Sequence, residues 1–253
     1  MKKTFFALLL TALLLGAGSA QQKPWTEWTK ADAEKILNQS AWGQTQTDTD
    51  TSEMMYSPTS QSGMSTSTRP GVTGTTTERQ SINSSRAAQG AKNQAISVNY
   101  HVRLLSAKPV RQAFMRVIEL TQKTPDKELL GDLQAFVQRD FSEFIVVAVA
   151  FDSTDGRFSG PALQAFSASN LGTLKNKTYL ERKDGKRVFL MQYHAPINDG
   201  IGAKFIFPRI VDEKKFLTAE SGSFRFYSEV TGQLKLNVSF KLSDMMYNGQ
   251  LEY

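Results

Sequence analysis

The continuous apolar segment at residues 144–151 constrains the fold of this chain more than any other stretch. Its sequence, FIVVAVAF, contains no polar side chain and is rich in β-branched residues. A short apolar run of this composition is typical of a strand that is buried on both faces. We therefore expect this segment to be the central strand of a sheet.

Alternation of apolar and polar residues predicts further strands. Residues 96–104 follow the pattern of a half-buried strand with one solvated face. The Asp184-Gly185 pair is a strong hairpin signal between strands expected at residues 177–182 and 187–193. Additional strands are expected at residues 203–208, 224–230 and 234–242.

Two helices are expected between the strands at residues 96–104 and 144–151. The first spans residues 109–122, and the second begins at Thr124, which can cap it, with Pro125 and Asp126 in its first turn. If the two strands are neighbours, this helix pair is long enough for a parallel connection. With a short helix at residues 161–167, the elements predict an α+β fold. Its sheet is mixed, mostly antiparallel and of about six strands, with helices on one side and an extra N-terminal helix.

The first residues have the pattern of a bacterial secretory signal peptide. Lys2 and Lys3 precede an apolar run at residues 5–15, and the small residues Gly18 and Ala20 precede Gln21. The run is shorter than the roughly 20 apolar residues that a membrane helix requires, and no later segment reaches that length. We therefore expect residues 1–20 to be removed and the protein to be periplasmic or secreted, with no membrane span.

The segment from residue 44 to residue 93 differs in composition from the rest of the chain. Ser or Thr occupies 20 of its 50 positions, so it offers too little apolar surface to offset the entropy cost of ordering. We interpret it as a disordered insertion. The expected organisation is a signal peptide at 1–20, a Trp-rich segment at 21–43, the insertion at 44–93 and an α+β domain at 94–253.

All three tryptophans of the chain lie in the short segment before the insertion. Thr29 is a good N-cap and Asp32 completes a capping-box pattern, which predicts a helix of about nine residues. A helix this short is marginal in water and requires a surface to pack on. Our main interpretation is that the tryptophans dock the helix onto the domain. The alternative is that Trp25 or Trp28 stays exposed as a stacking platform for a sugar or a protein partner.

This segment also carries a resemblance to other proteins. The string from Trp28 to Leu37, WTKADAEKIL, followed by Ser40-Ala41-Trp42, resembles the N-terminal signature of a group of uncharacterised exported bacterial proteins. The similarity extends weakly to residues 102–112 and 242–245 and covers a minority of the chain. The resemblance implies export and a shared domain, and it implies no activity and no catalytic residue.

The sequence contains no recognisable catalytic set. It has two histidines, His101 and His194, no cysteine and no Gly-x-Ser-x-Gly motif. His101 falls on the polar face of its strand, which favours a solvated side chain. Zinc sites and nucleotide-binding loops have no support in the pattern, and we predict no cofactor. Asp152 and Asp155 follow the central strand and form a possible ligand loop, although such a pair is more often simple turn chemistry.

The predicted hairpin carries a cluster of basic residues. The basic residues that we predict to take part in binding are Lys177, Arg182, Lys183 and Arg187. Such a cluster is usually a solvated face, and the alternative is attachment to an anionic component of the cell envelope. Removal of residues 1–20 takes away two lysines and lowers the formal charge from +6 to about +4, which is too small by itself to indicate nucleic acid binding.

These observations favour an exported, non-enzymatic protein that binds a protein partner or an envelope component. One alternative is a hydrolase with a scattered site, formed by Asp152, Asp155 and His194. Another is a carrier of an apolar ligand, which a cavity of a few hundred Å³ would favour and a filled core would exclude.

Overall fold

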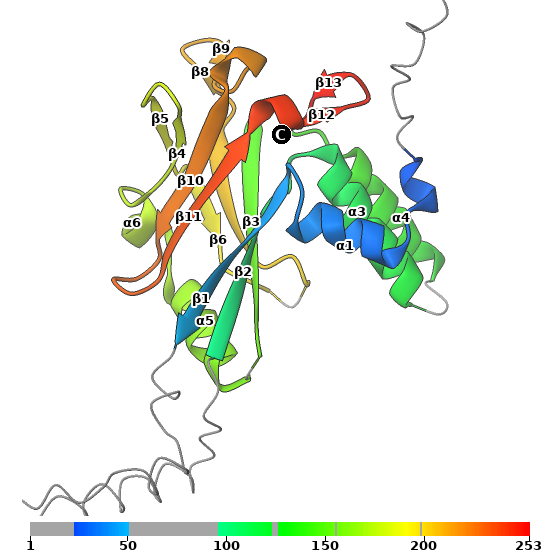
Figure 1. The fold of residues 1–253 in the computed structure, drawn as a ribbon, viewed down its shortest axis with the longest axis horizontal. Helices are drawn as coiled ribbons and strands as arrows, with labels where there is room; N and C mark the ends of the chain where they lie inside the picture. The colour runs from blue at the N-terminus through cyan, green and yellow to red at the C-terminus, as the bar shows by residue number, and fades with distance from the viewer. Residues whose placement is uncertain (1–22, 51–95, 123–125, 155, 198) are drawn as a thin grey trace, which may run out of the picture.

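The computed structural model describes residues 23–50, 96–122, 126–154, 156–197 and 199–253. Within these residues the strands form two main sheets that face each other, with helices beside them (Figure 1). The α+β class expected from the sequence is confirmed. The predicted signal peptide at residues 1–20 and residues 51–93 of the insertion lie outside the described residues.

The first sheet contains five strands in the order β1-β2-β3-β7-β6. The apolar run forms its central strand, as predicted. The strands are β1 (Gly43–Asp50), β2 (Ile96–Leu104), β3 (Phe144–Ser153), β7 (Ala203–Pro208) and β6 (Gln192–His194).

The second sheet contains four strands in the order β11-β10-β4-β5. It includes the predicted Asp-Gly hairpin, whose turn residue Gly185 adopts the positive φ of 83° that favours glycine. The strands are β11 (Lys235–Lys241), β10 (Ser223–Glu229), β4 (Thr178–Arg182) and β5 (Arg187–Phe189). Short pairs complete the strands: β8 (Ile210–Val211) with β9 (Lys214–Lys215), and β12 (Met246–Tyr247) with β13 (Gln250–Leu251).

Two expectations about the sheet are corrected by the structure. The expected parallel pairing is wrong, because β2 and β3 are antiparallel neighbours, with Val102 opposite Val149. The chain leaves β2 for the two helices and re-enters the sheet as β3 at the same end, so the connection does not have to cross the sheet. The strands are also divided between two sheets and are not gathered in one sheet of about six.

Aromatic side chains fill the space between the two sheets. Phe205 and Phe207 of β7 project toward Phe226 of β10, with ring centroids 5.4 and 6.2 Å apart, respectively. All three are fully buried. Since the strands alternate buried and half-exposed residues, each sheet turns one face to this shared core.

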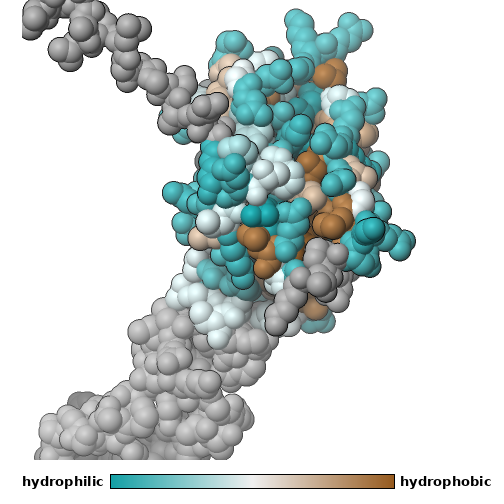
Figure 2. All heavy atoms as spheres, turned by 90° about the vertical axis from the view of Figure 1, so that its right-hand side faces the viewer, coloured by the Kyte–Doolittle hydropathy of each residue, from teal (hydrophilic) through white to brown (hydrophobic). Residues whose placement is uncertain are grey.

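Three helices pack together on one side of the first sheet (Figure 1). They are α1 (Lys30–Asn38), α3 (Lys108–Thr121) and α4 (Lys127–Gln138). Asp126 caps α4 by accepting a hydrogen bond from the Leu129 amide at 2.8 Å, so the helix cap lies two residues after the predicted one at Thr124. Figure 2 views this side and shows apolar surface among polar residues. No helix in the described part of the chain is long and apolar enough to cross a membrane.

Arg103 joins the helical layer to the sheet. Its guanidinium donates to the Leu37 carbonyl (3.1 Å) and the Asn38 side chain (2.8 Å) at the end of α1, and it lies 5.2 Å from the Phe114 ring of α3. Burial lowers the pKa of Arg103 to about 10. A polar position in the β2 pattern therefore serves as an internal anchor.

Two more helices lie between β3 and β4. They are α5 (Gly156–Ala168), which is longer than the predicted helix at residues 161–167, and α6 (Leu171–Leu174). Phe166 of α5 is fully buried and stacks on Phe151 of β3 at 5.5 Å. This contact places α5 across one end of the first sheet (Figure 1).

The beginning of the predicted disordered insertion is ordered. Residues 44–50 belong to β1, which pairs with β2 along its whole length, so the expected boundary at residue 44 is wrong. The segment QTQTDTD has no apolar side chain to signal a strand. Its order comes from the backbone ladder and from polar contacts across the sheet.

Candidate functional site

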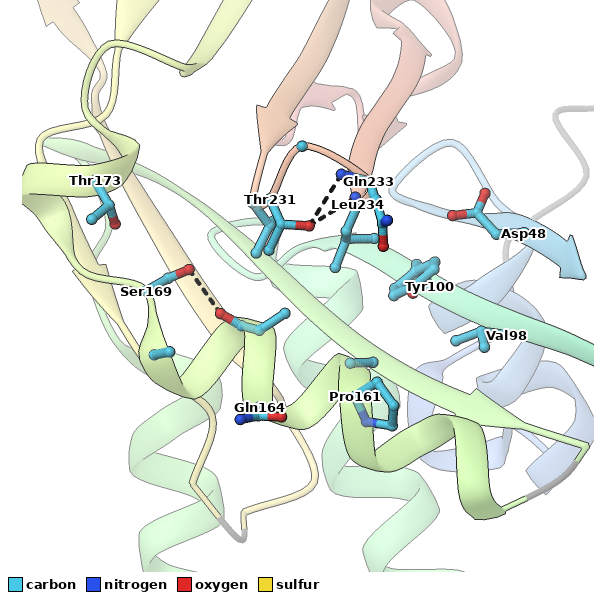
Figure 3. Close-up of a pocket in the computed structure, with 15 residues that line it drawn as sticks. Asp48, Val98, Tyr100, Pro161, Gln164, Ser169, Thr173, Thr231, Gln233 and Leu234 are labelled. Carbon is cyan, nitrogen blue, oxygen red and sulfur yellow. Dashed lines mark hydrogen bonds between the residues drawn. The ribbon is translucent and has the colours of Figure 1, made fainter.

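A groove lies at the end of the two-sheet core, between α5 and the turn that joins β10 to β11. It has a volume of about 730 Å³. We call it the end groove. In Figure 3, Thr231, Gln233 and Leu234 of the turn lie across from Pro161 and Gln164 of α5. Asp48, Val98 and Tyr100 extend the lining onto the first sheet.

Hydrogen bonds fix the turn that forms one wall of the end groove. The Val230 amide donates to the Leu234 carbonyl at 3.0 Å. The Thr231 hydroxyl oxygen accepts from the amides of Gln233 (3.3 Å) and Leu234 (3.0 Å), as Figure 3 shows. These bonds satisfy the backbone locally, as is common for Thr in turns. The wall is therefore preformed.

Small side chains leave the opposite wall open. Ala162, Ala165 and Ala168 follow one another at three-residue intervals on α5 and line the groove. The Ser169 hydroxyl donates to the Ala165 carbonyl at 2.8 Å and so satisfies the helix end. Larger residues at these positions would fill the space that a ligand occupies.

The end groove contains several uncharged polar side chains and little formal charge. Burial and, to a smaller extent, the negative charge of Asp48 raise the pKa of Tyr100 to about 12, so its hydroxyl stays protonated at neutral pH. Among the described residues that line the groove, Asp48 carries the one formal charge. The groove therefore suits an apolar ligand with a basic or hydrogen-bonding group.

The structure places Asp152 in a row of polar residues across the outer face of the first sheet. The His101 ring lies between two partners, with Nε2 at 2.6 Å from Asp152 and Nδ1 at 2.9 Å from the Thr45 hydroxyl. Asn99 donates to the other Asp152 oxygen at 2.9 Å. The His101 side chain is only 13% exposed, so the expected solvated histidine is wrong.

This row has the residue types of a nucleophilic triad, but its Thr45 hydroxyl has a second hydrogen-bond acceptor. The Thr45 hydroxyl also lies 3.1 Å from the Asn38 carbonyl, to which it can donate. The Asn38 carbonyl therefore competes with the His101 ring for the single hydroxyl hydrogen of Thr45. Partial burial raises the pKa of Asp152, but hydrogen bonds from His101 and Asn99 lower it more, and the net pKa is below its usual range. The row binds three strands together.

The other residues of the predicted hydrolase site do not join Asp152. His194 pairs with Lys204 of β7, and Lys204 pairs with Ala148 of β3. His194 therefore lies two strands away from β3, and its level on β3 is four residues from Asp152. Asp155 lies outside the described residues. The scattered site is therefore not assembled. No cluster of three or more His, Asp or Glu side chains in the described ranges has the arrangement of a metal site.

Two of the three tryptophans are buried, which confirms the docking interpretation for them. Trp28 is 8% exposed and its indole donates to the Lys23 carbonyl at 3.1 Å. Trp42 is 5% exposed and donates to the Glu252 carbonyl at 2.8 Å. The exposed platform is therefore wrong for Trp28. Trp25 is half-buried against the same core.

The basic residues of the hairpin are largely paired within the protein. Lys177 contacts Glu229 at 3.0 Å, and Arg187 contacts Glu181 at 2.7 Å. Arg182 contacts Asp184 at 2.8 Å and donates to the Phe216 carbonyl. Lys183 lies on the same hairpin and lines a separate shallow cleft beside Arg182. The hairpin is thus a salt-bridged surface, with much of its charge neutralised.

Sequence reasoning missed the end groove because its lining comes from four separate segments. The three alanines and the Thr231-Gly232 turn were visible as ordinary helix and turn residues, and nothing in the sequence placed them opposite each other. Comparison with protein-family models, with curated proteins and with solved structures finds no match to this chain.

Proposed function

We propose that this chain is an exported, non-enzymatic binding protein that holds a protein partner in the end groove. The observation that carries the proposal is a preformed concave surface, about 730 Å³ in volume, on which apolar side chains alternate with polar ones and which carries a single charge. Ligand sites generally combine a volume of this size with apolar surface and hydrogen-bonding groups.

The packing of the core supports a surface groove over an internal ligand cavity. Phe205, Phe207 and Phe226 fill the space between the sheets, and each is fully buried. The second acceptor of the Thr45 hydroxyl supports binding over hydrolysis, because the Asn38 carbonyl competes with the His101 ring for the hydroxyl hydrogen. The leader pattern at residues 1–20 supports export.

A selection with displayed peptides tests the proposal directly. The protein, produced from its full coding sequence, is immobilised and challenged with a dodecamer phage library. Peptides recovered by the wild type are then measured against Ala168→Trp, which places a large ring in the groove at an exposed position of α5. Leu163→Trp is the matched control, because Leu163 is 49% exposed on α5 and does not line the groove.

The expected result is that Ala168→Trp weakens peptide binding at least about tenfold, which corresponds to about 1.4 kcal/mol. Leu163→Trp should bind as the wild type does. Equal thermal unfolding of the two variants establishes that both are folded. If the library yields no specific peptide, or if both variants bind equally well, the end groove is not the binding site.

A further inference from the structure

The two main sheets present unpaired strand edges to each other. In the described residues β1 is the last strand of the first sheet and β11 is the last strand of the second. The two strands do not pair, although both lie at the same side of the molecule (Figure 1). We call the gap between these edges the seam.

The backbone of β1 turns alternate peptide groups toward the seam. The Leu104 amide donates to the Trp42 carbonyl at 2.8 Å, so Trp42, Gln44, Gln46 and Asp48 bond to β2. In an antiparallel ladder the residues between them point their N–H and C=O groups to the other side. Thr45, Thr47 and Thr49 therefore offer these groups to the seam.

The backbone of β11 does the same from the opposite side. The Leu242 amide donates to the Gly222 carbonyl at 2.9 Å, which places even-numbered residues of β11 in the ladder with β10. Lys235, Asn237, Ser239 and Lys241 accordingly direct their peptide groups into the seam. Two rows of donors and acceptors thus face each other.

One side chain already bonds to β11 as a peptide backbone does. The Gln46 amide nitrogen donates to the Lys235 carbonyl at 2.8 Å, and its oxygen accepts from the Asn237 amide at 2.9 Å. This donor and acceptor pair reproduces the bonding of one strand residue to its neighbour. We call this contact the Gln46 bridge.

The seam opens into a cavity at each end of the Gln46 bridge. The end groove lies on one side, where it contains Asp48 of β1 and Leu234 next to β11. On the other side is a cleft of about 610 Å³, which contains Thr45 of β1 and Ser239 of β11. Open space therefore lies at both ends of the Gln46 bridge, and the two strand edges come together at the bridge itself.

We propose that the partner enters the seam as an extended peptide strand that bonds to β1 and β11 and places side chains in the end groove. This inference rests on the proposed function and specifies its binding mode. An extended backbone is the ligand whose alternating N–H and C=O groups match both rows, and strand addition to an exposed sheet edge is a known mode of peptide recognition. Asp48 adds charge complementarity for a Lys or Arg side chain at the groove end.

The test uses the tightest dodecamer from the display selection and a set of its single N-methylated analogues. N-methylation removes one backbone donor and leaves the side chain in place. A strand between two edges uses consecutive amides alternately for β1 and β11, so each central N-methyl group should weaken binding about tenfold. N-methylation at the peptide ends should have little effect.

The protein side of the test is Gln46→Ala, which removes the Gln46 bridge that the peptide must displace. We expect this variant to bind the dodecamer more tightly, by roughly tenfold for two hydrogen bonds. Gln192→Ala, an exposed position on β6 at the far edge of the first sheet, is the matched control and should bind as the wild type does.

The outcomes separate the binding mode from the proposed function. Loss of affinity at central N-methyl positions together with tighter binding by Gln46→Ala supports strand insertion. Peptides that depend on the open groove at Ala168 but tolerate every N-methyl group overturn strand insertion and leave the proposed function intact. A selection that yields no specific peptide overturns both.

Discussion

Replacing Trp28 with alanine tests whether the tryptophan segment docks α1. Trp28 is 8% exposed, donates its indole N–H to the Lys23 carbonyl, and accepts at its own carbonyl from Arg116 at 2.8 Å. A buried tryptophan removes on the order of 200 Å² from water. At about 25 cal/mol per Å², this burial contributes up to about 5 kcal/mol. Because truncations of buried aromatic side chains cost about 3–5 kcal/mol, we expect Trp28→Ala to lower the free energy of unfolding by about 3 kcal/mol.

The assay is urea unfolding followed by far-ultraviolet circular dichroism, with Trp25→Ala as the matched control. Trp25 is half-buried in a short 3₁₀ turn. Trp25→Ala should therefore lower the free energy of unfolding by clearly less than Trp28→Ala does. A separate early transition in Trp28→Ala would mean that α1 detaches before the sheets unfold, which is consistent with docking. A value within about 0.5 kcal/mol of the wild type, the usual range for surface substitutions, would refute the reasoning.

Three further predictions concern the sheets and their anchors. Arg103→Met should lower the free energy of unfolding by about 2–3 kcal/mol in urea titrations, because the Leu37 carbonyl and Asn38 lose a charged donor; an unchanged midpoint would contradict the anchor role. Phe226→Ala should lower the free energy of unfolding by about 3–5 kcal/mol in the same titrations, since it leaves a cavity at the centre of the core. A decrease no larger than that caused by an alanine substitution at an exposed position would contradict this. The pKa of Asp152 is lower in the folded state, so its stabilisation is present above the unfolded pKa and is lost as pH falls through the folded value. Asp152→Asn should therefore lose less stability than the wild type between about pH 5 and pH 3, and identical pH profiles would contradict that assignment.

The sequence predicted most elements that carry an apolar pattern. The central strand, the two alternating strands at the end of the chain and the Asp-Gly hairpin were found because burial and turn chemistry act locally. The α+β class followed from their order. The capping box at Thr29 also correctly predicted α1, in which both capping bonds are present.

The parts that escaped prediction depend on contacts between distant segments. The polar strand β1 has no apolar face, and it is held by its ladder with β2 and by the bonds of Thr45 and Gln46. The direction of pairing between β2 and β3 depends on where the helical excursion returns, and sequence spacing does not fix this. His101 was expected in solvent because alternation shows which face a residue occupies and not what covers that face.

The candidate site was inaccessible to sequence reasoning for a related reason. An edge strand has a hydrogen-bonded neighbour on one side only. The complete strand order of both sheets is therefore needed to show that β1 and β11 are edge strands. The Gln46 bridge joins residues 189 and 191 positions apart in sequence. No local pattern indicates a pairing of this kind.

Amide hydrogen exchange in the presence of the selected dodecamer tests strand insertion most directly. The amides of Thr45, Thr47 and Thr49 point into the seam, so in the free protein they should exchange rapidly. Bound peptide should slow exchange at these three positions and at Ser239 of β11, while the intervening β1 residues, which already bond to β2, change little. Protection confined to α5 and the turn between β10 and β11, with the three threonine amides still exchanging rapidly, would contradict strand insertion at the seam.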